Sequence, residues 1–211
     1  MKVLVLGAGN MGAAFVKQLV LAGHDVSVTA RTAGKAEALA AAHPGARAVQ
    51  AAQAAVGADA IVLATAYGDA VAALRSLGDL AGKVVIDISN PLTADYMGLT
   101  LGHSTSAGEE IAKAVPQAHL VKGFNTLFAQ VLFEGADFGN GQRAAVFLAT
   151  DHADARQTAT ALAVSMGFQA VDAGGLHNAR YLEPLAGLNV YLGYGAGRGT
   201  AIAPTWIARA A

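Results

Sequence analysis

The chain of 211 residues is 54% hydrophobic and 14% charged, with a formal net charge of −1 and no cysteine. Its length fits one domain, with or without a small appendage, that buries a sizeable core. The near-neutral balance offers no basic field to attract nucleic acid, and the lack of cysteine excludes disulfides and thiolate chemistry. Six scattered histidines without H-x-H or H-E-x-x-H spacing argue against a metal site. Glycine clusters and polar residues interrupt every apolar stretch, so we expect no membrane span and a cytoplasmic protein.

The first dozen residues organise the rest of the chain. Val3 to Leu6 is an unbroken apolar run, typical of a strand buried on both faces of a parallel sheet. Gly7, Gly9 and Gly12 follow at the G-x-G-x-x-G spacing. A further apolar run, Ala13 to Leu21, predicts a helix directly behind them. We expect Gly7 to allow a tight turn, Gly9 to let the backbone approach a pyrophosphate, and Gly12 to let helix and strand pack closely. The alternative is a strand–helix turn that binds nothing.

The end of the second strand indicates which dinucleotide binds. The alternating run Asp25 to Ala30 predicts this strand, and an NAD-binding fold usually places an acid near its end. This chain instead has Arg31, Thr32 and Lys35. A guanidinium can hold a 2′-phosphate through two hydrogen bonds, and the hydroxyl and ammonium add to the site. The pattern therefore favours NADP over NAD, against the alternative of a solvated basic turn.

The remaining pattern alternates between strands and helices. Further strands are predicted over residues 46–49, 59–64, 83–88, 119–123, 144–149 and 168–172, and further helices over residues 35–42, 69–77, 104–115 and 152–166. This alternation predicts an α/β fold with a Rossmann-like, doubly wound and mainly parallel sheet. Residues 176–188 are helical in pattern, and glycines and tyrosines crowd the stretch after them. We therefore expect an NADP-binding Rossmann domain over residues 1–175 and a small C-terminal helical extension over residues 176–211.

The cofactor is expected beyond the carboxyl ends of the strands, where ligands bind in doubly wound sheets. Four turns supply the expected contacts: Gly7, Ala8, Gly9, Asn10, Met11 and Gly12; Arg31, Thr32 and Lys35; Ala64, Thr65, Ala66 and Tyr67; and Ser89, Asn90 and Pro91. No single residue is expected to act as a catalytic acid or base, because the chain lacks a Tyr-x-x-x-Lys pair. Lys122 lies at a strand's end, and we interpret it as a surface lysine rather than a proton donor.

Five segments resemble the NADP-dependent oxidoreductases that use the deazaflavin coenzyme F420. They are Gly7-Ala8-Gly9-Asn10-Met11-Gly12, Ala30-Arg31-Thr32 with Lys35-Ala36-Glu37, Ser89-Asn90-Pro91-Leu92, Phe124-Asn125-Thr126, and Asp172-Ala173-Gly174 with Leu176, Asn178 and Arg180. Phe124-Asn125-Thr126 is also similar to the cytosolic domain of the Steap metalloreductases, which pass electrons from NADPH to a flavin. The resemblance implies a C-terminal extension that closes over the nicotinamide and helps to form a homodimer.

The resemblance also implies an acceptor pocket, for which the candidates are Asn125, Thr126, His177 and Arg180. Three hypotheses follow for the function. The first is an oxidoreductase that transfers a hydride between NADP(H) and a deazaflavin or a flavin (FMN or FAD). The second is an NADPH-dependent reductase of a small carbonyl or imine, and the third is a non-catalytic NADP-binding redox sensor. For His177 and Arg180, helix capping or an ion pair between protomers remains an equal alternative.

Overall fold

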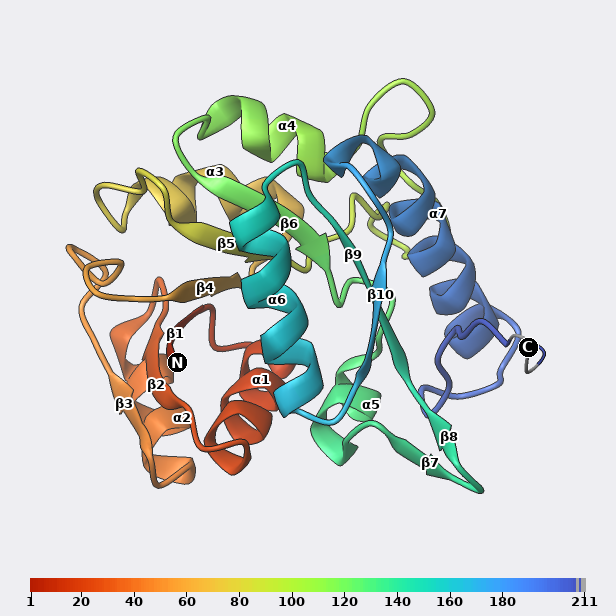
Figure 1. The fold of residues 1–211 in the computed structure, drawn as a ribbon, viewed down its shortest axis with the longest axis horizontal. Helices are drawn as coiled ribbons and strands as arrows, with labels where there is room; N and C mark the ends of the chain where they lie inside the picture. Colours follow the sequence, from red (N-terminus) through yellow and green to blue (C-terminus); the bar gives the residue numbers. More distant parts are fainter. Residues whose placement is uncertain (208, 210–211) are drawn as a thin grey trace.

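A computed structural model describes residues 1–207 and 209, and it shows one eight-stranded sheet covered by helices (Figure 1). The spatial order of the strands is β10-β9-β6-β5-β4-β1-β2-β3. Their bounds are β1 Lys2–Leu6, β2 Asp25–Thr29, β3 Ala46–Ala48, β4 Ala60–Leu63, β5 Val84–Asp87, β6 His119–Gly123, β9 Ala145–Ala149 and β10 Gln169–Asp172. This order confirms the Rossmann-like, mainly parallel sheet that the sequence predicts.

The order of the strands reverses beside β1. The chain runs outward through β2 and β3 on one side of β1, and then returns to β4 on the other side. The turns that leave β1 and β4 therefore separate at one edge of the sheet, where a crevice forms. The pairing between β6 and β9 is antiparallel, so β9 and β10 run against the other strands.

Helices cover both faces of the sheet. Their bounds are α1 Asn10–Leu21, α2 Ala33–Ala42, α3 Tyr67–Arg75, α4 Ala107–Ala114, α5 Ala129–Glu134, α6 Ala153–Ser165 and α7 Ala179–Val190. The short helix α5 and the hairpin of β7 (Asp137–Gly139) and β8 (Gln142–Arg143) were not predicted. Each is shorter than the window over which hydrophobic periodicity can be recognised.

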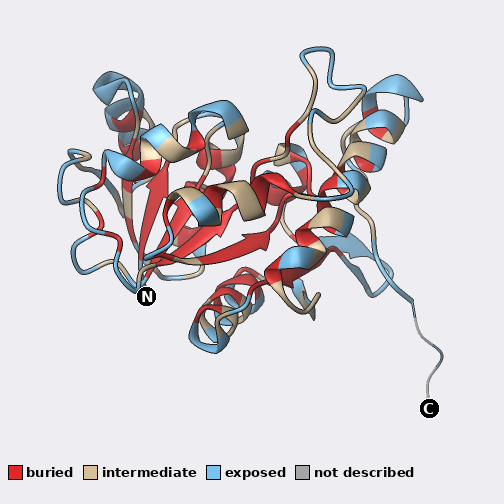
Figure 2. Cartoon of the chain, turned by 90° about the horizontal axis from the view of Figure 1, so that it is seen from above, coloured by how far each residue is buried: buried red, intermediate tan, exposed pale blue. Residues whose placement is uncertain are grey.

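Two apolar clusters, one on each face, explain why the strand sequences lack a polar face. Val3 and Val5 point to the face covered by α1, α2, α5 and α6, whereas Leu4 and Leu6 point to the face covered by α3 and α4. Successive side chains of a strand point to opposite faces, so a strand between two layers must be apolar throughout. Figure 2 shows the strands as a buried layer between helices whose outer surfaces are exposed.

The C-terminal segment adds a helix beyond this layered core. It begins with a 3-10 turn over Leu176–Asn178, continues as α7 with Pro184 inside it, and ends in a π-helical turn over Tyr191–Gly195. The division at residues 175 and 176 into two domains stays a prediction.

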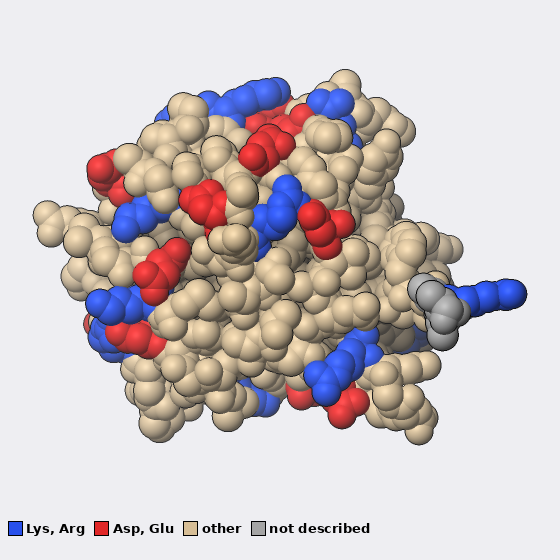
Figure 3. All heavy atoms as spheres, in the orientation of Figure 1, with Lys and Arg blue, Asp and Glu red and all other residues tan. Residues whose placement is uncertain are grey.

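The surface matches the near-neutral composition. Lys and Arg are interspersed with Asp and Glu over the face drawn in Figure 3. Among the described residues, none of the helices combines the length and the apolar character needed to cross a bilayer.

Candidate dinucleotide site

The three glycines after β1 differ in what surrounds them. Gly7 has a φ of +126°, and a Cβ there would lie 2.3 Å from the carbonyl oxygen of Ala64. A Cβ on Gly12 would lie 2.0 Å from the carbonyl oxygen of Gly7. A Cβ on Gly9, in contrast, would have no atom of the described residues within 4 Å. Gly7 and Gly12 are therefore required by the fold, whereas Gly9 keeps space open beside the backbone.

A cavity of about 750 Å³ opens at this turn, beyond the carboxyl ends of β1, β2 and β4. Gly9 precedes α1 without a side-chain cap, so no side chain satisfies the first N–H groups of this helix. Such a helix start binds an anion through these N–H groups and the positive end of its dipole. The volume falls within the range of small-molecule and cofactor pockets.

The cations expected to read a 2′-phosphate lie at the mouth of this cavity. Arg31 and Lys35 line it and are exposed, and Thr32 precedes α2 as its N-cap residue. Arg31 lies 3.5 Å from Asp69, and the two side chains are 87% and 59% exposed. A pair so exposed contributes little to stability, so a phosphate can displace the carboxylate at small cost. Asp69 and Glu37 also line the cavity, and neither was predicted to do so from the sequence.

The expected cofactor residues divide into two groups. Gly7, Ala8, Gly9, Arg31, Thr32, Lys35, Thr65 and Ala66 line the cavity. Asn10, Met11, Gly12, Ala64, Tyr67, Ser89, Asn90 and Pro91 do not line it, although each lies in or beside one of the same turns.

A second polar region lies where β4, β5 and β6 end. Four buried side-chain atoms have no hydrogen-bond partner within the described part of the chain: Thr65 Oγ1, Ser89 Oγ, Asn125 Oδ1 and Thr126 Oγ1. The large majority of buried side-chain polar atoms are paired, so four unpaired atoms at one edge of a sheet need an explanation. A bound ligand that completes their hydrogen bonds provides one.

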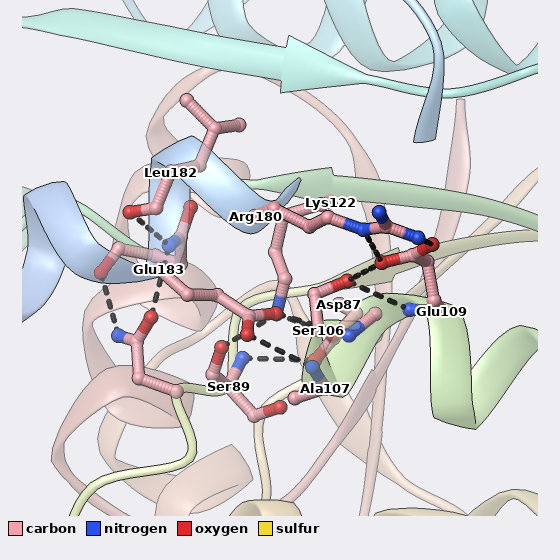
Figure 4. Close-up of polar contacts among 12 residues, drawn as sticks. Asp87, Ser89, Ser106, Ala107, Glu109, Lys122, Arg180, Leu182 and Glu183 are labelled. Carbon is pink, nitrogen blue, oxygen red and sulfur yellow. Dashed lines mark hydrogen bonds and ion pairs between the residues drawn. The ribbon is translucent and has the colours of Figure 1, made fainter. Parts of the chain in front are cut away.

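Beneath these atoms lies a cluster of buried charges, which we call the buried triad and define as Asp87, Lys122 and Glu183 (Figure 4). Lys122 Nζ lies 2.6 Å from Asp87 Oδ2, 2.9 Å from Glu183 Oε1 and 2.7 Å from the carbonyl oxygen of Ser89. Glu183 also accepts hydrogen bonds from the backbone N–H groups of Ala107 and Gly108, at the start of α4. One carboxylate of α7 is thereby joined to β6 and α4.

The structure corrects the interpretation of Lys122 as a surface lysine, because its side chain is 0% exposed. Burial lowers the pKa of the Lys122 ammonium, but the Asp87 and Glu183 carboxylates outweigh burial and leave this pKa above its usual value. A polar residue at the end of an apolar strand is expected to be exposed from sequence alone. The partners that make its burial possible lie 35 and 61 residues away, and one of them belongs to α7.

The acceptor-pocket candidates lie in different surroundings. Asn125 is buried and donates from Nδ2 to Asn90 Oδ1 and to the carbonyl oxygen of Leu182, which leaves its Oδ1 free. Thr126 is buried as well, whereas His177 is exposed.

Arg180 is already engaged within the chain. Its Nε donates to Glu109 Oε2 at 2.9 Å and its Nη2 donates to Glu109 Oε1 at 2.6 Å, so it holds α7 against α4. Hydrogen bonding from Arg180, together with Ser106 and against the effect of burial, lowers the pKa of Glu109.

The charges of the buried triad shift the pKa of Tyr67, a residue beside the cavity. Burial raises the pKa of the Tyr67 hydroxyl, and the carboxylates of Glu110, Glu183 and Asp87 raise it further. Tyr67 begins α3, next to the cavity residues Thr65 and Ala66. The hydroxyl of Tyr67 therefore stays protonated at neutral pH and can donate a hydrogen bond.

Comparison with known proteins agrees with this fold. The family described as "NADP oxidoreductase coenzyme F420-dependent" matches residues 2–91. The F420-dependent NADP reductase of Methanothermobacter marburgensis is 30% identical over 209 residues, which cover 91% of this chain and 92% of that protein. A crystal structure of a putative F420-dependent NADP reductase from Arthrobacter sp. FB24 is 30% identical, with a TM-score of 0.81. The match covers 95% of this chain and 96% of that chain.

A longer relative matches only in part. The rat metalloreductase STEAP3 is 31% identical over 185 residues, which are 87% of this chain and 36% of that protein. The chain thus spans about a third of the length of this relative. The doubly wound sheet with its glycine turn defines a Rossmann-type oxidoreductase fold. Within that class, the chain belongs to the family of coenzyme F420-dependent NADP oxidoreductases.

Proposed function

We propose that this chain is a cytoplasmic NADPH-dependent oxidoreductase that transfers a hydride between NADP(H) and the ring of a deazaflavin or a flavin. One observation supports this reaction over carbonyl or imine reduction by Lys122. The Nζ of Lys122 meets three acceptors, from Asp87, Ser89 and Glu183, which together occupy all its N–H donors. It therefore has no free N–H with which to protonate a carbonyl or imine substrate.

The residues present fit NADP at both ends of the proposed site. The start of α1 would hold the pyrophosphate beside Gly9, and Arg31, Thr32 and Lys35 would hold the 2′-phosphate. The free buried atoms of Thr65, Ser89, Asn125 and Thr126 offer hydrogen bonds to the ribose and carboxamide of the nicotinamide half. When bound, the nicotinamide supplies the hydride.

The chain itself needs to do little chemistry. Its task is to hold two rings face to face at reacting distance, which contributes through orientation rather than through proton transfer. Asn125 is fixed by Asn90 and by the backbone of α7, so its free Oδ1 has a defined position. We infer that Asn125 and Thr126 orient the nicotinamide or the acceptor ring, and that Arg180 acts indirectly by holding α7.

We also propose that two copies associate through the outer face of α7. Tyr181, Leu188, Tyr191 and Tyr194 are 74%, 54%, 51% and 62% exposed and recur at helical spacing along this segment. Exposed aromatic and leucine side chains on one face are typical of an interface. Light scattering should give the mass of two chains for the wild type, and a Leu188→Glu variant should give the mass of one chain.

The activity is tested by measuring NADPH oxidation against coenzyme F420, FMN, FAD and a panel of small carbonyls and imines. Turnover with the deazaflavin or a flavin supports the proposal, whereas turnover confined to carbonyls or imines contradicts it. Thr126→Val provides a matched test of the orphaned atoms, because valine keeps the shape and removes only the free hydroxyl. We expect stability to be unchanged and binding of NADPH or of the acceptor to weaken about tenfold, the value of one lost hydrogen bond.

Thr150→Val is the control for that variant. Thr150 is also a buried threonine after a strand, but its Oγ1 donates to the carbonyl oxygen of Leu120 at 2.6 Å. The Thr150 variant should lose stability and keep ligand affinity. If Thr126→Val instead loses stability and keeps affinity, the free hydroxyl has no ligand partner.

A further inference from the structure

A cluster of His119, His152 and Asp154 lies away from the proposed cofactor site. His119 begins β6, His152 is the N-cap residue of α6, and Asp154 lies in the first turn of α6. The Nδ1 of His119 is 2.8 Å from Asp154 Oδ2. The two imidazole rings stack with their centroids 4.0 Å apart and an interplanar angle of 7°. One ligand atom from each of the three residues lies within 4.8 Å of the other two.

These groups match the donor set of a transition-metal site. Imidazole nitrogens suit zinc-type cations, and zinc binds them at about 2.0–2.1 Å and carboxylate oxygens at about 2.0–2.2 Å. In a tetrahedral arrangement, ligand atoms are then about 3.3 Å apart, so the stacked rings of His119 and His152 must turn until one nitrogen of each converges with Asp154 on the ion. The ring of His152 has no hydrogen bond to any described residue, so its lone pair is available. Asp154 and His119 are 61% and 30% exposed, which leaves room for water as a fourth ligand.

The charges around the cluster permit a cation. The start of α6 carries the positive end of the helix dipole, and the Asp154 carboxylate in the first turn offsets it. Arg156, the nearest cation along the helix, is turned away because it pairs with Asp172 and donates to the carbonyl oxygen of Thr150.

We propose that His119, His152 and Asp154 bind one divalent cation of the zinc type, with water completing the coordination. No metal site is expected from the sequence, because the histidines have no metal-binding spacing. His119 and His152 are 33 residues apart, and only the antiparallel pairing of β6 with β9 brings the start of β6 to the start of α6. The cluster is at the amino end of β6, whereas the cavity is at the carboxyl ends of the strands, so the proposal does not depend on the proposed function.

Such an ion would join a strand to a helix in the folded state alone. Binding to the folded state raises stability according to the ratio of free metal to the dissociation constant. At a hundredfold ratio, the thermal midpoint should rise by about 5–10 °C for a chain of this size. Mg²⁺ should produce no such shift, because it prefers oxygen ligands.

The test is isothermal titration of the full chain with Zn²⁺, in a buffer that does not chelate it. The wild type should bind one ion per chain, and His152→Ala and His119→Ala should each weaken binding at least tenfold. His43→Ala is the matched control, since His43 also lies at a helix end and belongs to the opposite edge of the sheet. That variant should bind like the wild type.

NADPH titrations of the same samples keep the two sites apart. His152→Ala should leave NADPH affinity unchanged, and circular dichroism should show that the variant is folded. Zinc binding that is equally strong in both cluster variants, or heat that does not saturate in the wild type, would overturn the proposal. Failure of the NADPH assays alone would bear on the proposed function and leave the metal site standing.

Discussion

The two halves of the sheet treat charge in opposite ways. On the side of β1, β2 and β4, the charged groups Arg31, Lys35 and Asp69 stand exposed around an open cavity. On the side of β5, β6 and α7, the buried triad is sealed from solvent. In the first half, an anion can replace Asp69 as the partner of Arg31, because that exposed ion pair is weak. In the second half, the buried triad links β5, β6, α4 and α7 before any ligand binds. A site that must grip a flexible phosphate and align a reacting ring requires both properties.

The sealed half leaves only neutral polar atoms unpaired. Each ion of the buried triad has partners: Lys122 meets three acceptors, and Glu183 accepts from two backbone N–H groups as well. The four orphans nearby are hydroxyls and one amide oxygen. An unpaired buried charge costs far more than an unpaired hydroxyl. The unpaired atoms that a ligand could reach are therefore neutral hydroxyl and amide groups, because these can stay unpaired in the free protein at moderate cost.

The largest effect should come from breaking the buried triad. Lys122→Met leaves the Asp87 and Glu183 carboxylates facing each other without a cation, and it should lower the free energy of unfolding by about 3–5 kcal/mol. Urea unfolding measures the loss. Adding Asp87→Asn to this variant should recover part of it, because one uncompensated charge is removed. Lys113→Met is the control: Lys113 is 66% exposed, and its variant should unfold like the wild type.

The second largest effect is expected in the glycine turn, where a variant of Gly9 should change NADPH binding without changing stability. Gly9→Val should fold normally, because its side chain enters open space, yet that side chain occupies the region proposed for the pyrophosphate. We expect NADPH affinity to fall by at least about a hundredfold, or ~2.7 kcal/mol. Calorimetric titration and thermal unfolding measure the two properties separately.

Gly12→Ala provides the opposite case in the same turn. Its Cβ meets the carbonyl oxygen of Gly7 at 2.0 Å, so this variant should lose stability before it loses anything else. A Gly9→Val variant that binds NADPH as the wild type does would show that the pyrophosphate lies elsewhere.

The third effect concerns the choice of cofactor. Arg31→Ala should remove most of the preference for NADPH over NADH, a loss of about 1.5–3 kcal/mol for one charge-assisted hydrogen bond. NADH affinity should barely change. Arg47→Ala is the control, because Arg47 pairs with Asp25 at the other end of β2. Equal weakening of both cofactors by Arg31→Ala would mean that the guanidinium stacks on the adenine rather than binding the 2′-phosphate.

The open half of the site could be predicted from sequence, because its information is local. Gly7, Gly9 and Gly12 lie within six residues of one another, and Arg31 follows the next strand. The periodicity of strands and helices predicted the sheet, and each end of the predicted strands lies within one residue of the observed end. The glycine turn, the position of Arg31 and the strands all follow from residues that are close together in the sequence.

The sealed half could not be predicted in the same way. Its contacts join residues that are 33 to 76 positions apart, and each residue is uninformative alone: a lysine at a strand's end, or a glutamate in a helix. Glu183 was not singled out at all, although it connects α7 to the core. The signal available was a single acid in a largely apolar helix, and an acid on the exposed face of that helix would give the same pattern.

The smallest effect tests how α7 is held outside the buried triad. The pKa of Glu109 is lowered by its hydrogen bonds with Arg180, so the pair stabilises the folded state at pH values above the ordinary value of 4.5. This contribution is lost as the pH falls through the lowered pKa, where Glu109 becomes protonated. At pH 7, Arg180→Gln should lower the thermal midpoint by about 2–4 °C, the shift that a weak, partly exposed pair produces in a chain of this size. The difference between wild type and variant should stay constant down to about pH 5 and shrink towards zero in more acidic solution. Lys113→Gln, which removes the exposed pair with Glu110 on the same helix, should change the midpoint less at every pH. A difference that persists unchanged in acid would mean that Arg180 supports α7 through packing of its side chain and not through the charge of Glu109.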